Sequence, residues 1–188
     1  MKIEQTPLSG VVVITPARFG DHRGFFSESY SFKALAEHGI TTRFVQDNHS
    51  LSMTQGTIRG LHFQAPPHAQ DKLVGCGRGV LFDVAVDIRK GSPTYGQWLG
   101  IELSFENGKQ LLVPAGFAHG FVTRAPETEI IYKCSDYYAQ ETEGAVAWDD
   151  PQVGIDWGLG DIAPVLSNKD ANAPPLADLN SPFTFEDV

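Results

Sequence analysis

The chain has 188 residues, and 41% of them are apolar, which is enough to bury one sizeable core. Its net charge of −9 argues against general binding to nucleic acid or to an anionic membrane surface. The first ten residues lack the apolar core of a signal peptide, and no apolar run is long enough to span a bilayer. We therefore expect a single domain over residues 1–188 of a cytoplasmic protein, with Cys76 and Cys134 reduced rather than joined in a disulfide.

The first quarter of the chain predicts three extended segments and one short helix. Residues 11–14 form an apolar strand before a proline, and residues 25–30 form a second strand after a polar turn. Ser31 can cap a helix that stops at Gly39, and residues 42–45 are extended again.

Short strands separated by turns dominate the remainder. The clearest alternation of apolar and polar residues is at 80–89, and Asn107-Gly108 is a strong hairpin signal. Further strands are predicted at residues 101–105, 111–113, 130–134 and 145–148, and the tail after about Ala171 is expected to be irregular. Many short strands with almost no helix predict an all-β fold, an antiparallel sandwich or barrel of the jelly-roll type.

Three residues capable of chemistry, Arg59, His62 and Lys72, fall within fourteen positions of one another. Strict strand alternation places His62 and Gln64 on one face and Arg59 on the other. An imidazole and an amide among apolar neighbours are typical of a pocket lining, at the mouth of a barrel. If Arg59 also faces the pocket, either Gly60 forms a bulge or Arg59 reaches round from the rim.

Residues 114–119 have the form P-x-G-x-x-H, which resembles the second signature of the cupin superfamily, a family of small jelly rolls. In metal-binding cupins the first signature supplies two His and one Glu. Here His62 stands six residues after Gly56, but Gln64 occupies the next ligand position and no suitably spaced Glu follows. Two imidazoles and one amide make a poor transition-metal site, so we predict that no metal is bound.

Longer motifs resemble the dTDP-4-dehydrorhamnose 3,5-epimerase family, in order over nearly the whole chain. They are residues 19–26 (FGDHRGFF), 28–30 (ESY), 44–50 (FVQDNHS), 59–64 (RGLHFQ), 82–89 (FDVAVDIR), 91–96 (GSPTYG), 113–121 (VPAGFAHGF), 132–133 (YK) and 166–170 (LSNKD). The resemblance implies epimerisation of dTDP-4-dehydro-6-deoxy-D-glucose to dTDP-4-dehydro-L-rhamnose, without a cofactor. The C4 ketone of this sugar acidifies the hydrogens on C3 and C5, so the site needs a base, an acid across the ring and a cation at the enolate oxygen.

The resemblance also assigns catalytic roles. His62 matches the general base, Asp170 the carboxylate that orients it, Tyr132 the acid that returns a proton at C5, and Lys72 the cation at the enolate. Without the motifs, His62 would more often be a hydrogen-bonded core residue, Asp170 and Lys72 solvated surface groups, and Tyr132 an aromatic strand residue. Asp83 is a weaker candidate as a partner of Lys72.

Substrate-binding residues follow from the same resemblance. They are Arg23, Arg59, Lys72 and Lys169 for the diphosphate, Glu28, Gln46, Asp47 and Asn48 for the thymidine-sugar end, and His119, Tyr138 and Glu143 as further contacts. A homodimer with paired N-terminal strands is implied, which leaves open whether Arg23 and Glu28 serve their own or the partner's pocket. Segment 50–58 offers no assignable site residue.

Three alternatives remain open on the sequence. The chain resembles relatives that epimerise only one carbon of a related dTDP-4-keto sugar, although Tyr132 favours the double epimerase. A non-catalytic cupin that binds a nucleotide sugar would not need His62, Asp170 and Tyr132 together. A metal-dependent cupin enzyme is the third.

Overall fold

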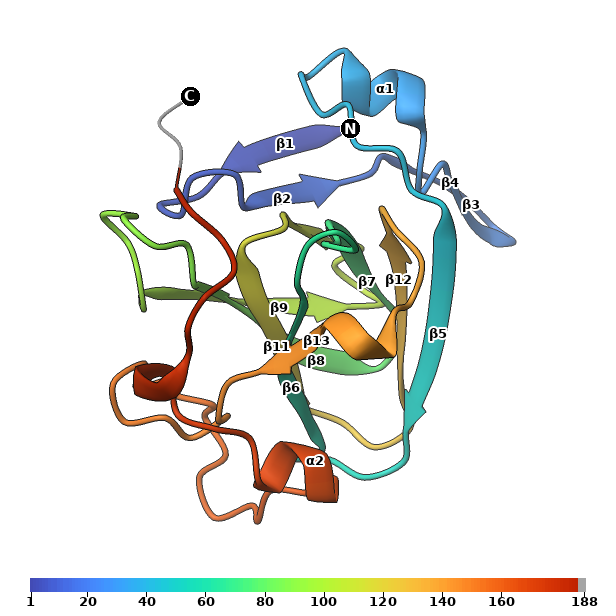
Figure 1. Cartoon of the computed structure of the whole chain (residues 1–188). Coiled ribbons are helices and arrows are strands. Elements are labelled where there is room, and N and C mark those ends of the chain that lie inside the picture. Colours follow the sequence, from blue (N-terminus) through green and yellow to red (C-terminus); the bar gives the residue numbers. More distant parts are fainter. Residues whose placement is uncertain (186–188) are drawn as a thin grey trace.

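The computed structural model describes residues 1–185 and consists almost entirely of antiparallel strands (Figure 1). One sheet has the strand order β1 (Lys2–Gln5), β2 (Val12–Thr15), β10 (Gln110–Val113), β7 (Lys72–Arg78), β12 (Thr128–Cys134) and β5 (Gln46–Ser52). The other has the order β13 (Glu143–Ala145), β6 (Ile58–Gln64), β11 (Phe117–Thr123), β8 (Val80–Asp87) and β9 (Trp98–Ser104). Two packed antiparallel sheets confirm the predicted all-β jelly roll.

Apolar side chains fill the space between the two sheets. Val74 and Leu111 from the first sheet meet Leu81 and Phe121 from the second in one buried cluster. A second cluster lies on the outer face of β6, β8 and β11, beneath the segment from Val146 onward.

Two short α-helices and two 3₁₀ turns (Gln140–Thr142 and Leu176–Asp178) complete the described elements. Helix α1 (Phe32–Ala36) begins as predicted at Ser31, whose hydroxyl accepts a hydrogen bond from the Ala34 amide. Helix α2 (Asn168–Ala171) was not predicted, although Ser167 caps it in the same way. Among residues 1–185, no helix is long and apolar enough to cross a membrane.

Some predicted strand boundaries are wrong. Residues 42–45 lie before a strand rather than in one, because β5 begins at Gln46. The strand expected over 25–30 ends at Ser27, and the one expected over 145–148 is β13, which ends at Ala145. Both cysteines are free thiols, but only Cys134 is fully buried, and Cys76 is partly exposed.

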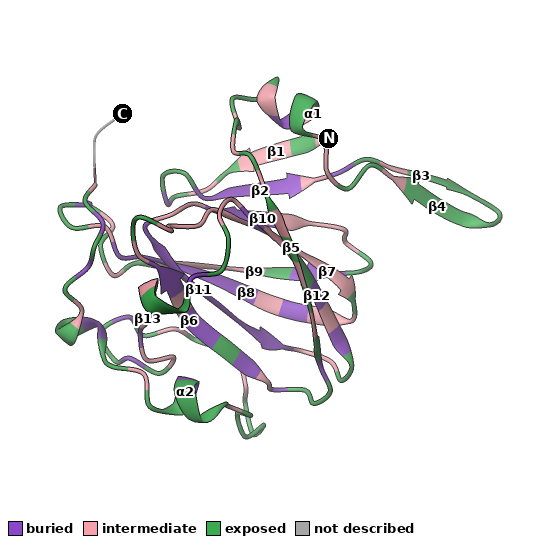
Figure 2. Cartoon of the chain, turned by 45° about the vertical axis from the view of Figure 1, so that its right-hand side comes forward, coloured by how far each residue is buried: buried purple, intermediate pink, exposed green. Residues whose placement is uncertain are grey.

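A separate hairpin of β3 (Arg18–Asp21) and β4 (Gly24–Ser27) pairs only with itself and projects from the body of the chain (Figure 2). Its aromatic residues Phe19 and Phe26 are 67% and 70% exposed. Such apolar exposure on a projecting arm is unusual for a soluble monomer and indicates an interaction surface.

Candidate active site

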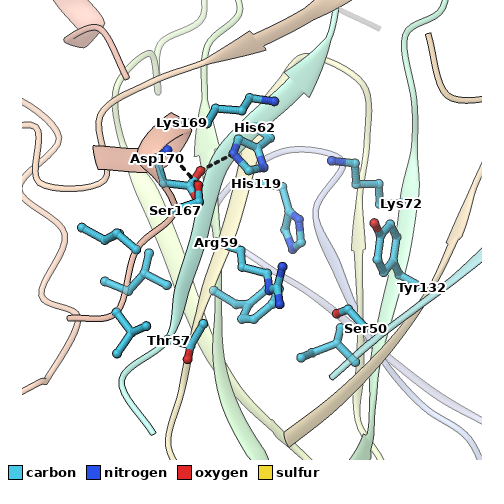
Figure 3. A pocket seen from close by; sticks show the side chains of 15 residues that line it. Ser50, Thr57, Arg59, His62, Lys72, His119, Tyr132, Ser167, Lys169 and Asp170 are labelled. Atoms are coloured by element: carbon cyan, nitrogen blue, oxygen red, sulfur yellow. Dashed lines mark hydrogen bonds and ion pairs between the residues drawn. The ribbon is translucent and has the colours of Figure 1, made fainter. Parts of the chain in front are cut away.

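A cavity of about 470 Å³ lies between the two sheets beside α2, which supplies Lys169 and Asp170 to its lining. It is lined by Ser50, Thr57, Ile58, Arg59, His62, Lys72, His119, Phe121, Ile130, Tyr132, Val165, Leu166, Ser167, Lys169 and Asp170. All four residues predicted to be catalytic are in this set. Figure 3 shows His62 and Asp170 on one side of the cavity, with Lys72 and Tyr132 on the other.

Arg59 and His62 both face the cavity because β6 contains a bulge. His62 pairs with His119, but three residues back Arg59 pairs with Phe121, so β6 has one extra residue where β11 has none. Gly60 within the bulge has φ +131°, and a Cβ atom there would lie 2.5 Å from the Gly120 Cα. The bulge predicted at Gly60 is thus confirmed, and only glycine fits this close approach.

His62 and Asp170 form a short hydrogen bond, with 2.6 Å between Nε2 and Oδ1. The Ser167 hydroxyl donates to the other carboxylate oxygen of Asp170, at 2.8 Å. Burial would raise the pKa of Asp170, but the hydrogen bonds from His62 and Ser167 outweigh burial and hold this pKa below its ordinary value. An ionised Asp170 accepts a hydrogen bond from Nε2–H, so in the neutral imidazole Nδ1 carries the free lone pair.

Lys72 and Tyr132 come from the neighbouring strands β7 and β12 of the other sheet. Burial lowers the pKa of the Lys72 ammonium, and its Nζ has no hydrogen-bond or ion-pair partner within residues 1–185. Burial raises the pKa of the Tyr132 phenol, which keeps it protonated at neutral pH. Among the residues that the structure describes, the wall opposite His62 therefore offers an amine without a partner and a proton donor.

His119 lies beside His62 and has a carboxylate of its own. Its Nε2 is 2.9 Å from Oδ1 of Asp83, which is fully buried. Asp83, expected as a partner of Lys72, forms its hydrogen bond with His119, while its negative charge acts to raise the pKa of Lys72 against the larger effect of burial. The second oxygen of Asp83 has no partner among the described residues.

A smaller hollow of about 120 Å³ adjoins the cavity and shares His62, Lys72 and Tyr132 with it. Four further predicted substrate contacts line it: Gln46, Asn48, Tyr138 and Glu143. Glu143 forms an ion pair with Lys169 of the main cavity, 2.6 Å between Oε2 and Nζ. The two spaces therefore join at the three residues they share, which are all predicted to be catalytic.

Three predicted substrate contacts lie away from these walls. Asp47 points to the outer face of β5, where it pairs with Lys133 at 2.8 Å. Arg23 is at the tip of the β3–β4 arm and pairs with Asp21, and Glu28 follows β4 in an exposed position. Within one chain, none of the three meets the cavity.

Segment 50–58, from which no site residue was expected, contributes Ser50, Thr57 and Ile58 to the cavity. A signal for Ser50 was present in the sequence. Gln46, Asn48 and Ser50 alternate with exposed residues along β5, so period-two alternation places Ser50 on the same face as two predicted contacts.

The model of the dTDP-4-dehydrorhamnose 3,5-epimerase family matches residues 5–178. The chain belongs to this family. A dTDP-4-dehydrorhamnose 3,5-epimerase from Sinorhizobium fredii is 50% identical over 188 residues, covering 100% of this chain and 96% of the relative. The family assignment and the curated relatives identify the chain as an isomerase, an epimerase of dTDP-rhamnose biosynthesis.

Solved structures of the epimerase family share the fold. The dTDP-6-deoxy-D-glucose-3,5-epimerase of Legionella pneumophila, in complex with dTDP-4-keto-L-rhamnose, has TM-score 0.91 and 48% identity, covering 95% of this chain and 94% of that one. A less similar 3'-monoepimerase from Streptomyces bikiniensis, in complex with dTDP-quinovose, has TM-score 0.86 and 35% identity, covering 92% and 88%.

Proposed function

We propose that this epimerase inverts both C3 and C5 of dTDP-4-dehydro-6-deoxy-D-glucose, giving dTDP-4-dehydro-L-rhamnose. The observation that carries the proposal is the arrangement of the cavity: a His-Asp pair on one wall faces, on the other, a partly buried Tyr and a Lys that has no ion-pair partner within residues 1–185. A site that only binds a sugar has no need of a base and an acid on opposite walls.

In the first step, Nδ1 of His62 removes the hydrogen on the carbon next to the C4 ketone. The electron pair of the C–H bond moves into the enolate, and the imidazole becomes an imidazolium. Asp170 stabilises that imidazolium through the 2.6 Å bond to Nε2, as the carboxylate does in a hydrolase His-Asp pair.

The negative charge then develops on the C4 oxygen. Lys72, which has no anion partner of its own within residues 1–185, supplies the compensating charge. His119, on the neighbouring strand, can accept a hydrogen bond from a sugar hydroxyl at Nδ1, because its Nε2 faces the Asp83 carboxylate. Inside a partly buried cavity these interactions are stronger than they would be in water.

Tyr132 returns a proton to the opposite face of the ring, chiefly at C5. Its raised pKa suits an acid that must hold its proton until the enolate forms. Each step moves only protons, so the chemistry requires no redox cofactor. We also predict that no metal is needed, and elemental analysis of the purified protein tests this.

The nucleotide end is assigned to the remaining polar residues. Arg59 and Lys169 lie in the main cavity and offer charge to the diphosphate, with Arg able to bind it in a bidentate manner. Gln46, Asn48, Tyr138 and Glu143 line the adjoining hollow toward the thymidine. Asp47 is a weaker candidate, since its side chain points outward.

Arg23 and Glu28 require a second chain. We propose a homodimer in which each projecting arm places these residues at the partner's cavity. The exposed Phe19 and Phe26 support this, because a free arm leaves both rings in water.

Incubation with the dTDP-4-keto sugar in D2O, followed by NMR, tests the function. Deuterium at both C3 and C5 is the expected result. Deuterium at one carbon would favour a mono-epimerase, an alternative kept open by the similarity to the 3'-monoepimerase. Deuterium at neither carbon would exclude epimerisation of this substrate.

A further inference from the structure

Gln64 is a buried glutamine whose side-chain amide forms three hydrogen bonds, all of them to backbone atoms. It lies two residues after His62 on β6 and is only 5% exposed. Its Nε2 donates to the carbonyl oxygens of His68 at 2.7 Å and Tyr137 at 3.1 Å. Its Oε1 accepts a hydrogen bond from the Ala139 amide at 3.0 Å. Every one of these bonds satisfies a group on a loop rather than on a strand.

Two of the three bonds hold the residues on either side of Tyr138. Gln64 binds the carbonyl of Tyr137 and the amide of Ala139, while the Tyr138 amide itself donates to Oε1 of Gln46 at 3.2 Å. The backbone of Tyr138 is thus fixed at three successive residues. Its side chain is 58% exposed and lines the hollow next to His62, so the ring is free to contact a ligand.

We propose that Gln64 is a positioning residue for nucleotide binding, which holds the Tyr138 loop at a set distance from the strand that carries His62. The proposal rests on the proposed function, in which Tyr138 contacts the thymidine end. One amide links the two ends of the site, since His62 and Gln64 are on the same face of one strand. A substrate whose nucleotide contacts Tyr138 is thereby held with its sugar beside His62, the proposed general base.

The first experiment compares Gln64→Met with the unchanged chain. Methionine has a similar length but cannot donate to the two carbonyls or accept from the Ala139 amide. We expect the Kd for dTDP, measured by calorimetry, and the KM to rise by about five- to a hundredfold, the range for loss of one stacked aromatic contact. The kcat at saturation should stay within about threefold, because the reacting groups are untouched.

A double-mutant cycle separates positioning from general destabilisation. Tyr138→Ala should weaken dTDP binding to a similar extent, and adding Gln64→Met to it should cost less than about twofold more. Thr128→Val is the matched control: Thr128 is buried, its hydroxyl donates to the carbonyls of Ala125 and Val80, and it lines neither the cavity nor the hollow. This control should lower the melting temperature without changing Kd or KM.

Fluorine NMR gives a second measurement, on the free enzyme. The chain has five tyrosines, so 3-fluorotyrosine labelling yields a spectrum in which Tyr138→Phe identifies the Tyr138 signal. Gln64→Met, or Gln64→Glu if the methionine variant does not fold, should shift or broaden that signal. The proposal would be overturned if Gln64→Met left both the Kd for dTDP and the Tyr138 signal unchanged. It would also be overturned if the losses of affinity from Gln64→Met and Tyr138→Ala multiplied in the double mutant. If Tyr138→Ala binds dTDP normally, Tyr138 does not contact the nucleotide and the positioning role of Gln64 is rejected. Hydrogen exchange in D2O tests the proposed epimerisation independently of that result.

Discussion

His62 and His119 are direct cross-strand neighbours on β6 and β11, and each ring is hydrogen-bonded through Nε2 to a buried aspartate. The two pairs differ in their surroundings. Asp170 has partners on both oxygens, whereas Asp83 has one oxygen without a partner among the described residues. The His62 side chain is also the more exposed of the two, 30% against 10% for His119, and this supports the proposal that His62 rather than His119 is the base.

The first prediction compares these two histidines. His62→Asn should lower kcat by about a thousandfold or more, because it removes the general base and with it most of the rate enhancement from acid-base catalysis. His119→Asn should mainly raise KM, because His119 is assigned to sugar contact. Steady-state kinetics and exchange of the C3 hydrogen in D2O measure both. Equal losses of kcat in the two variants would contradict the assignment of the base.

Asp170 should make folding sensitive to acid. Its pKa in the folded chain is lowered, so its stabilising effect is fully present above the unfolded pKa, about 3.9, and is lost as the pH falls through the lower folded value. Asp170→Asn should therefore lower the free energy of unfolding by about 1–3 kcal/mol at pH 7, the usual size for hydrogen bonds to a charged group. Urea titrations at several pH values should show this difference shrinking below pH 4. A difference that is constant with pH would contradict the proposed ionisation.

Tyr132 separates the two carbons of the sugar. Tyr132→Phe removes only the hydroxyl, so His62 can still abstract a proton and the fold should be unchanged. We expect deuterium incorporation at C5 to fall by about a hundredfold, while incorporation at C3 falls by less than about tenfold. Time-resolved NMR in D2O measures both positions in one sample. Equal slowing at both carbons would assign Tyr132 to binding rather than to proton return.

The sequence predicted the jelly roll because apolar and polar residues alternate at period two along most strands. A bulge at Gly60 could also be predicted, because Arg59 and His62 are three positions apart and a regular strand would place them on opposite faces. It did not predict α2, because a four-residue helix has no periodicity to detect; only the Ser167 cap could have indicated it. The role of Ser50 was missed because β5 is polar along most of its length. The strand therefore lacks the alternation of apolar and polar residues by which a strand is detected in sequence.

The bulge itself can be tested through Gly60. Gly60→Ala would place a Cβ atom 2.5 Å from the Gly120 Cα and 2.8 Å from the His119 carbonyl oxygen, so the two strands would have to move apart. We expect a loss of about 3 kcal/mol in unfolding free energy, and a loss of activity as Arg59 and His62 lose their common face. Gly91→Ala is the control: Gly91 also has positive φ, +81°, but a Cβ atom added there would meet no other atom within 4 Å, so we expect a cost of only about 1 kcal/mol. Chemical denaturation measures the unfolding free energy of both variants. Similar losses in Gly60→Ala and Gly91→Ala would show that the close approach of the two strands is not what destabilises Gly60→Ala.

The last prediction concerns the projecting arm. Arg23 is absent from the cavity of its own chain, and its arm is anchored where Phe25 contacts Phe105, at the side of the sheet. If each arm serves the partner's cavity, a dimer of an Arg23→Ala chain with a His62→Asn chain contains one intact site. That site combines the normal His62 of the first chain with the normal Arg23 of the second.

Each variant alone should lose activity, because all its sites lack either Arg23 or His62. Mixing the two variants, after denaturation and joint refolding, should therefore restore activity. Random pairing makes half of the dimers mixed, each with one working site of two, so about a quarter of the wild-type activity is expected. Each variant refolded alone is the control, and sedimentation measures the dimer. If the arm served its own cavity, every site in the mixture would lack either Arg23 or His62, and mixing would restore nothing. Activity that stays at the level of the separate variants, in a sample shown to be dimeric, would thus reject exchange of the arms.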